Sequence, residues 1–271
     1  MFKINNLTYQ YDKTRKALNN VSMDFNKGNI IGIIGSNGSG KSTLFNNLMG
    51  ILKSTEGEIL YNGEQIKYDK KSLYNLRKEV GIVFQDPEKQ IFYSMVYDDI
   101  AFALRNIGID EKTIKERIHT ALEAVNGLQF IDRPVHNLSF GQKKRVAIAS
   151  VVAMENKLVL LDEPTAGLDP ISTRAIVDII KGLNKRGVKI VISSHDMNLI
   201  YEICDYVYVL NQGVLINEGT REEVFINEEK IDEAGLELPW LVKLHKNMGL
   251  PIFTREEDLY SYWNHREQKT V

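Results

Sequence analysis

Short apolar segments separated by polar turn residues dominate the first part of the chain. Residues 2–9 and 17–25 are each expected to form a strand. The near-continuous apolar run 29–34 predicts a strand that is buried on both faces of a sheet. Residues 41–49 are then predicted to form a helix that ends at Gly50, the usual glycine position at a helix C-terminus.

Asn62-Gly63 predicts a two-residue hairpin turn between strands at 58–61 and 65–67. From about Ser72 to Met154 the pattern becomes mainly helical. Helices are expected in this part at 72–78, 94–106, 111–125 and 139–154. The sequence therefore predicts an antiparallel β subdomain followed by a helical subdomain at about 72–155.

Strands of the parallel type return in the second half, at 158–161 and 190–193, with a helix from about 172 to 184 between them. A hairpin-like pair is expected at 206–210 and 214–218. Beyond Arg221 the charged sequence predicts helices with breaks at Gly235, Pro239 and 249–251. The expected division is a main domain at 1–220 and a C-terminal helical appendage at 221–271.

Composition narrows the class of protein. The 271 residues include 34 Lys and Arg against 36 Asp and Glu, so the net charge of −2 argues against a nucleic-acid binder with a large basic face. A single cysteine, Cys204, allows no internal disulfide and is expected to be a core thiol in a reducing cytoplasm. The first residues have no signal-peptide layout, and the longest apolar run, 146–154, is too short to cross a bilayer.

A phosphate-binding loop follows the buried strand at 29–34. Residues 35–42 fit the pattern G-x-x-x-x-G-K-[ST] and open the next helix, which is the context this motif requires. Its glycines let backbone N–H groups surround phosphates, Lys41 neutralises the β and γ oxygens, and Ser42 reaches Mg²⁺. The expected nucleotide-binding residues of this loop are Gly35, Ser36, Asn37, Gly38, Ser39, Gly40, Lys41, Ser42 and Thr43.

Three polar side chains follow strands at the same predicted sheet edge. Asp162 and Glu163 come after the apolar run 158–161, and His195 follows the strand at 190–194. Ligands of parallel sheets collect at this edge. Asp162 is therefore expected to hold Mg²⁺ through water, Glu163 to act as general base, and His195 to contact the γ-phosphate or the attacking water.

Ser139 and Gln142 form an S-x-x-Q capping box at the start of the helix at 139–154. Capping alone would explain both residues. A serine hydroxyl, the flexible Gly141 and helical N–H groups also make a second anion site. Because the chain already has one phosphate loop, this second site is expected to serve the ATP of another subunit.

Two further residues are candidates for the nucleotide site. Gln85 ends the apolar run 80–84 and is expected to reach Mg²⁺ and the attacking water. Tyr11 is a candidate for stacking on adenine, with Tyr9 as its competitor and an ordinary strand aromatic as the structural alternative.

The order and spacing of these motifs resemble the nucleotide-binding subunits of ATP-binding-cassette transporters, over residues 2 to about 220. The resemblance implies an α/β fold with a phosphate-loop ATPase core and a mixed sheet. It assigns Tyr11 to adenine, Gln85 to coupling, residues 138–142 (the signature segment) to a second subunit's nucleotide, and Asp169 of the turn 166–169 to nucleotide binding. The segments 81–90, 138–149 and 162–170 look most like energy-coupling-factor transporters, and within them like cobalt-import ATP-binding proteins.

That resemblance implies an ATPase subunit that powers membrane import of cobalt, nickel or a vitamin, with ATP and Mg²⁺ as cofactors. The catalytic residues would be Glu163, His195, Gln85 and Lys41, and the metal residues Ser42, Gln85 and Asp162. The implied partners are a second ATPase subunit (an identical chain or a paralogue), an integral membrane coupling subunit and a substrate-binding membrane subunit, with no nucleic acid. The implied location is the cytoplasmic face of the cell membrane, as a peripheral protein.

Other members of the same broad class give alternative functions. Chromosome-maintenance ATPases need a long coiled-coil insertion, whereas residues 43–138 hold only short helices broken by Pro87 and Gly108. Ribosome-associated relatives usually carry two cassettes, and a drug or lipid exporter subunit would have the same ATPase core. One residue departs from the commoner signature LSGGQ, because Phe140 replaces its first glycine.

Overall fold

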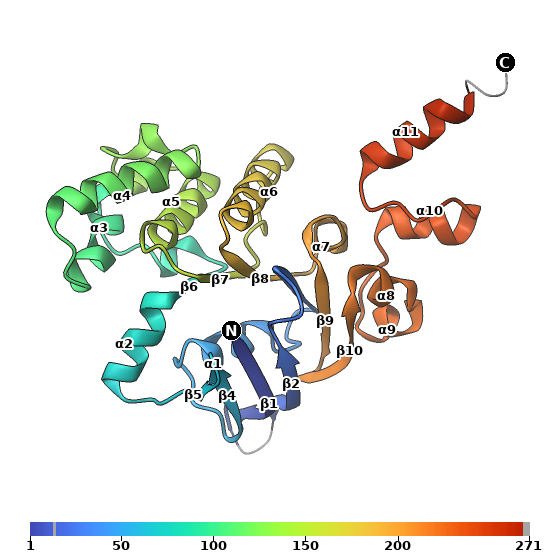
Figure 1. Cartoon of the computed structure of the whole chain (residues 1–271), viewed down its shortest axis with the longest axis horizontal. Coiled ribbons are helices and arrows are strands. Elements are labelled where there is room, and N and C mark those ends of the chain that lie inside the picture. The colour runs from blue at the N-terminus through green and yellow to red at the C-terminus, as the bar shows by residue number, and fades with distance from the viewer. Residues whose placement is uncertain (13–14, 268–271) are drawn as a thin grey trace.

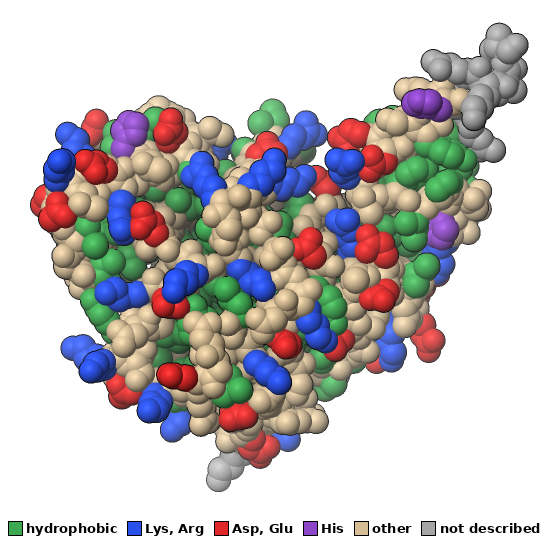
Figure 2. All heavy atoms as spheres, in the orientation of Figure 1, with side chains coloured by type: hydrophobic (Ala, Val, Ile, Leu, Met, Phe, Trp, Pro, Cys, Tyr) green, Lys and Arg blue, Asp and Glu red, His purple; other side chains and the backbone are tan. Residues whose placement is uncertain are grey.

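In the described part of the chain, two β-sheets and the helices around them form the protein, shown as a cartoon in Figure 1 and as a space-filling view in Figure 2. The computed structural model describes residues 1–12 and 15–267. The four-stranded antiparallel sheet has the order β2 (Lys16–Asp24), β1 (Phe2–Gln10), β4 (Glu56–Tyr61) and β5 (Glu64–Gln65). The six-stranded mixed sheet has the order β10 (Val214–Thr220), β9 (Tyr206–Asn211), β3 (Ile30–Ile34), β8 (Lys189–Ser194), β7 (Leu158–Asp162) and β6 (Val80–Val83).

The parallel strands place three predicted site segments at one sheet edge. Strand β3 pairs in parallel with β8, which pairs in parallel with β7, and β7 pairs in parallel with β6. All four strands therefore end at the same edge. The phosphate loop follows β3, the acidic pair lies at the end of β7, and His195 follows β8.

Both faces of the six-stranded sheet are covered, as the continuous apolar runs predict. On β3, Ile31 and Ile33 belong to a core shared with the four-stranded sheet and α1 (Lys41–Leu48). Ile30 and Ile34 belong to a larger core on the opposite face. The helices that contribute to this second core include α3 (Val96–Asn106), α4 (Glu111–Ala124), α5 (Phe140–Ala153), α6 (Pro170–Lys185) and α7 (Met197–Ile203).

Strand β6 lies inside the segment whose pattern predicts mainly helices. It follows α2 (Lys70–Glu79) and pairs with β7 at the sheet edge. An apolar run of this length is compatible with a strand or with a buried helical segment, so periodicity alone does not separate the two. At Gly81 an added Cβ would lie 2.2 Å from Val151 Cγ1, which shows how closely α5 packs on this strand.

The C-terminal part consists of four helices on the side of the molecule opposite α3–α5 (Figure 1). They are α8 (Arg221–Ile226), α9 (Glu228–Glu233), α10 (Trp240–Met248) and α11 (Glu256–Glu267). Breaks occur at Gly235, Pro239 and 249–251, where the sequence predicts them. Of the expected appendage, residues 268–271 lie outside the described part of the chain.

Two smaller expectations concern burial. Cys204 is fully buried at the end of α7, and burial raises the pKa of its thiol. Within residues 1–12 and 15–267, no helix combines the length and apolar character needed to cross a bilayer.

Candidate functional site

The phosphate loop connects the buried strand β3 to α1 and depends on glycine geometry. Gly38 and Gly40 have φ values of +79° and +109°, which residues with a side chain rarely adopt. An added Cβ at Gly40 would lie 2.7 Å from the Ala17 carbonyl oxygen. No side chain caps α1, whose N-cap residue is Gly40. Its first N–H groups are therefore positioned to bind an anion.

Lys41 is buried within this loop. Its Nζ donates to the carbonyl oxygens of Gly35 at 2.6 Å and Ser36 at 3.2 Å, and it lies 3.5 Å from Glu163 Oε1. The ammonium group is thus held between the loop backbone and the acidic segment.

A cavity of about 1000 Å³ opens over the loop and brings most of the predicted nucleotide residues together. It is lined by Tyr11, the loop residues 36–43, Gln85 and Glu163. Gly35 directly follows β3 and is not among the residues that line the cavity. Sequence reasoning missed six lining residues, namely Asp12, Arg15, Lys16, Ala17, Asn211 and Gln212. Their elements can be recognised in the sequence, but their approach to the loop results from the packing of β2 and the β9–β10 turn.

Tyr11 lies beside this cavity, directly after β1. Its side chain is 64% exposed, and its hydroxyl lies 3.2 Å from Thr43 Oγ1. Tyr9, the competing candidate, meets the Tyr11 ring edge-on at a centroid distance of 5.0 Å. Only Tyr11 of the two lines the cavity, and its exposed face is available for stacking on a planar base.

The acidic pair is oriented by Ser193, the fifth residue of β8. Ser193 Oγ donates to Asp162 Oδ1 at 2.5 Å and accepts a hydrogen bond from the Glu163 backbone N–H at 3.0 Å. Sequence reasoning did not identify this serine. Its position next to the end of β7 results from strand pairing, because Asp162 is in register with Ser193.

Glu163 has the arrangement expected of a general base. One carboxylate oxygen, Oε2, lies 2.8 Å from Nδ1 of His195, and because a carboxylate only accepts, Nδ1 carries the proton of this hydrogen bond. The other, Oε1, is buried without a hydrogen-bond partner among the described residues. The backbone of Glu163 has φ of +47°, a conformation that costs about 1–2 kcal/mol for a residue with a side chain. Such strain is typical of functional sites.

Gln85 follows β6 and lines the cavity, whereas Gln90, a few residues later, faces α5. The Phe84 N–H donates to Gln90 Oε1 at 3.1 Å, and Gln90 Nε2 donates to Ala147 O at 3.1 Å and Ser150 Oγ at 3.3 Å. One amide side chain therefore joins the segment around Gln85 to the helix that begins at the signature segment.

The signature segment lies outside the phosphate-loop cavity. Ser139 caps α5, with Gln142 N–H donating to Ser139 Oγ at 3.3 Å and Ser139 N–H donating to Gln142 Oε1 at 3.0 Å. Ser139, Gly141 and Gln142 are not among the residues that line the cavity. Asp169 also lies outside it, as the N-cap residue of α6, where hydrogen bonds from Ser172 lower the pKa of its carboxyl.

Phe140, the residue that departs from the commoner signature, packs on its own chain. Its ring is 40% exposed, and a Cβ added at Gly167 would lie 3.5 Å from Phe140 Cε1. Lys144 Nζ lies 5.6 Å from the centre of the same ring. The phenylalanine thus contacts the turn before Asp169 and leaves Ser139 exposed.

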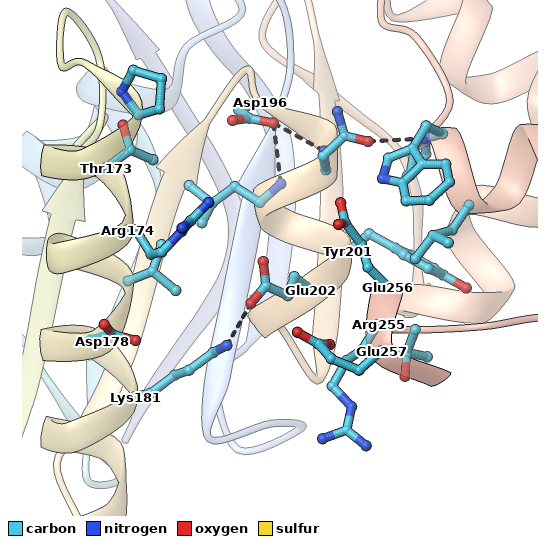
Figure 3. A pocket seen from close by; sticks show the side chains of 18 of the residues that line it. Thr173, Arg174, Asp178, Lys181, Asp196, Tyr201, Glu202, Arg255, Glu256 and Glu257 are labelled. Atoms are coloured by element: carbon cyan, nitrogen blue, oxygen red, sulfur yellow. Dashed lines mark hydrogen bonds and ion pairs between the residues drawn. The ribbon is translucent and has the colours of Figure 1, made fainter. Parts of the chain in front are cut away.

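A second cavity, of about 770 Å³, is lined by residues of α6, α7 and the C-terminal helices (Figure 3). Lys181 of α6 pairs with Glu202 of α7 at 2.5 Å across it. At its far side, the Trp240 N–H donates to Asn198 Oδ1 at 2.9 Å. The start of α10 is therefore bonded to α7, the helix that follows His195.

Magnesium was predicted together with the nucleotide, and the residues present fit it. Ser42, Gln85 and Asp162 offer hydroxyl, amide and carboxylate oxygens, the donors that Mg²⁺ prefers. Ser39 Oγ and Glu163 Oε1 are buried at the same cavity without a partner among the described residues. Two buried oxygens beside a phosphate loop that accept no hydrogen bond from the described residues favour a site completed by a ligand. The fold and this site together define a phosphate-loop nucleotide-binding protein.

Comparison with known proteins agrees with this class. A family model described as ABC transporter matches residues 18–166. A putative ABC transporter ATP-binding protein of Listeria monocytogenes is 50% identical over 262 residues, which cover 97% of this chain and 98% of the relative. A cobalt import ATP-binding protein, CbiO, of Salmonella typhimurium is 47% identical over 96% of this chain and 94% of its own length. An energy-coupling factor transporter ATP-binding protein, EcfA, of Methanocaldococcus jannaschii is 44% identical over 91% and 90%.

Solved structures give the same result. The structure of cbiO1 from Clostridium perfringens, described as part of the ABC transporter complex cbiONQ, has a TM-score of 0.78 and 41% identity and covers 90% of this chain and 98% of its own. A dimeric ATP-binding cassette bound to ADP and Pi has a TM-score of 0.73 and 28% identity, covering 82% and 99%. The chain belongs to the ABC transporter family and is an ATP-binding subunit that hydrolyses ATP for transport. The predicted fold class is thereby confirmed.

Proposed function

We propose that this chain powers an energy-coupling-factor transporter that imports a metal ion, cobalt or nickel, or a vitamin. Support comes from the similarity to proteins named for cobalt import and for energy coupling. The observation that carries the catalytic part is the position of Glu163 at the phosphate-loop cavity, between Lys41 and His195. An exporter or another ABC system is the alternative, since the ATPase chemistry would be the same.

The proposed reaction is in-line attack of water on the γ-phosphorus of ATP. Glu163 Oε1 accepts the proton of the attacking water, the new P–O bond forms, and the bond to the ADP oxygen breaks. The Nδ1–H group of His195 holds the other carboxylate oxygen in place. Lys41 offsets negative charge on the phosphates.

Magnesium would be held by Ser42, Gln85 and, through water, Asp162, and when bound it supplies positive charge to the β and γ oxygens. Gln85 also orients the attacking water, and Tyr11 stacks on the adenine.

The second half of each nucleotide site comes from another subunit in this proposal. Ser139 is exposed and lies outside the cavity of its own chain. The signature segment of one subunit would therefore close on the phosphate loop of the other, with Asp169 near the same interface. The second subunit is an identical chain or a paralogue.

An apolar groove of about 620 Å³ supports a membrane partner. Its lining includes Phe92, which is 77% exposed, as well as Phe84 and Phe102. The buried Asp99 fixes the loop that carries Phe92, because its Oδ1 accepts from the N–H groups of Phe92 at 2.8 Å and Tyr93 at 3.1 Å. We assign this groove to a helix of an integral coupling subunit, which in turn binds a substrate-binding membrane subunit. The chain would then be a peripheral protein on the cytoplasmic face of the membrane.

The domain division fits these roles. Residues 1–220 would form the ATP-binding cassette, with the helical subdomain at about 72–155 carrying both the groove and the signature segment. The appendage at 221–271 would brace α7 through the bond between Trp240 and Asn198.

Affinity purification from the native membrane in mild detergent, followed by mass spectrometry, tests this function. We expect a second cassette subunit, a small integral coupling protein and a cobalt-, nickel- or vitamin-binding membrane protein. The groove variant Phe92→Asp should lose the membrane subunits but keep the ATPase activity of the isolated chain. Ile226→Asp, which places the same charge at another exposed apolar residue, should keep them. An exporter-type membrane subunit in the purified complex would contradict import.

A further inference from the structure

Lys144 is a fully buried lysine that the proposed reaction does not use. It lies on α5, five residues after Ser139, or about 7 Å further along the helix. Its Nζ donates at 2.7 Å to the backbone carbonyl oxygen of Glu163. A buried ammonium group is costly unless it is compensated, so a lysine retained here needs a reason beyond filling space.

Lys144 lies near charged and aromatic groups from three parts of the site. Burial lowers the pKa of its ammonium to about 8, while the charges of Glu163, Asp162 and Asp86 oppose this shift. Asp86 directly follows Gln85. The ring of Phe140 lies over the same ammonium group. The side chain therefore connects the helix of the signature segment with the acidic pair.

The hydrogen bond from Lys144 goes to Glu163, the residue of the site whose backbone is strained. Glu163 has its backbone at φ of +47°, and its N–H donates to Ser193 Oγ, in the peptide group on the other side of its Cα. Ser193 holds the amide and Lys144 holds the carbonyl, so the two bonds together fix the direction of the Glu163 side chain. Small displacements of a catalytic group can lower a rate about a hundredfold.

We propose that Lys144 is a positioning residue that ties the direction of the Glu163 carboxylate to the position of α5. This inference rests on the proposed function, in which Glu163 serves the ATP of its own chain and Ser139 serves the ATP of the second subunit. Binding of α5 to the ATP of the second subunit would then change the position of Glu163 at the ATP of its own chain through the Lys144 ammonium group. Lys144 itself does not line the phosphate-loop cavity.

The test is a double-mutant cycle of Lys144→Met and Glu163→Gln. Methionine nearly keeps the volume of the lysine side chain but removes the donor. In the full-length chain we expect kcat for ATP to fall about tenfold to a hundredfold while KM stays within about twofold. Lys143→Met removes the neighbouring lysine, which pairs with Glu88 outside the cavity, and should leave kcat unchanged. Thermal unfolding of each variant identifies any loss that comes from the fold.

The cycle separates positioning from a structural effect. Because Lys144 acts through Glu163, adding Lys144→Met to Glu163→Gln should change the residual hydrolysis, measured by single-turnover release of labelled phosphate, by less than about twofold. A wild-type kcat in Lys144→Met, or a full additional loss in the double variant, would overturn the proposal. Lys144→Leu, which also removes the donor, takes the place of Lys144→Met in the same cycle if the methionine variant does not fold.

The same measurements distinguish this inference from the proposed function. Wild-type turnover in Glu163→Gln would remove the catalytic assignment of Glu163 and the inference with it. A loss of activity in Glu163→Gln together with wild-type turnover in Lys144→Met would remove only the role of Lys144.

Discussion

The phosphate loop and the start of α5 are both helix N-termini suited to anions, yet they are built differently. At α1 the N-cap is a glycine, no side chain caps the helix, and the loop lines a large cavity. At α5 a capping box pairs Ser139 with Gln142, and Ser139 is exposed. The first site keeps its backbone N–H groups for a ligand within the chain. The second satisfies two N–H groups itself.

The capping box nevertheless leaves one donor at α5. Ser139 Oγ accepts from the Gln142 N–H, so its hydroxyl proton remains available to an acceptor outside the chain. In the proposed function the two sites therefore differ in completeness: the loop would bind phosphate by itself, whereas the signature segment would contribute a donor only when another subunit presents a phosphate.

The largest effect is expected from Glu163→Gln at the phosphate-loop cavity. The amide cannot accept the proton of the attacking water, so kcat should fall about 10²- to 10⁴-fold. ATP binding and ATP-induced dimerisation should persist, because the phosphate loop is intact. Steady-state hydrolysis and size-exclusion chromatography with ATP measure both. Loss of ATP binding together with activity would contradict a purely catalytic role.

Ser139→Ala tests the signature segment. Loss of one donor to a charged phosphate should lower turnover about tenfold to a hundredfold. The affinity of the monomer for ATP should not change, since Ser139 is outside its cavity. Thr220→Ala provides the matched control, because Thr220 and Glu223 form the same capping box at α8. Both variants should lose about 1 kcal/mol of stability, and only Ser139→Ala should lose activity.

A matched pair of glycine substitutions compares the two backbones. Gly40→Ala forces a side chain into φ of +109° and to 2.7 Å from Ala17 O, so we expect about 1–3 kcal/mol of destabilisation and weak ATP binding. At Gly141 an added Cβ meets Ser172 Oγ at 3.2 Å, a side-chain atom that can move. Gly141→Ala should keep ATP binding by the monomer and change stability by less than about 1 kcal/mol. Chemical denaturation and calorimetric titration with ATP compare the two variants, and equal effects would contradict the distinction.

The smallest effect is expected from Phe140→Gly, which restores the commoner signature. Glycine in the first turn of α5 should cost about 1 kcal/mol of stability, and the ring is lost from Gly167 and Lys144. Turnover should stay within about threefold, because Ser139, Gly141 and Gln142 remain. A larger rise or fall in kcat, measured beside thermal unfolding, would show that the phenylalanine affects dimer closure.

The sequence predicted most of the elements and motifs, because most of them depend on local patterns. The run at 29–34 and the loop after it required only burial on two faces and a glycine pattern. The convergence of Asp162 and His195 followed from parallel strands ending at one edge. The strand β6 was not expected, because its run is too short to show a period.

The contacts that orient the site could not be predicted in the same way. Ser193 lies beside Asp162 through strand register, and Arg15 and Gln212 reach the cavity through tertiary packing. Lys144 gave a weak signal, since it lies four residues before the buried Ile148 on the buried face of a helix. A lysine at such a position is costly, and the structure shows its hydrogen-bond partner.

Gln90 has a consequence for how the partners influence one another. Its planar amide accepts from the Phe84 N–H and donates to the Ala147 carbonyl of α5. Because Phe84 and Gln90 both line the groove, these bonds tie a movement of the groove to a movement of α5. In the proposed complex, a membrane helix that prefers one position of the groove would then favour one position of α5. Thermodynamic reciprocity requires that ATP change the affinity for the membrane subunit by the same factor as that subunit changes the affinity for ATP.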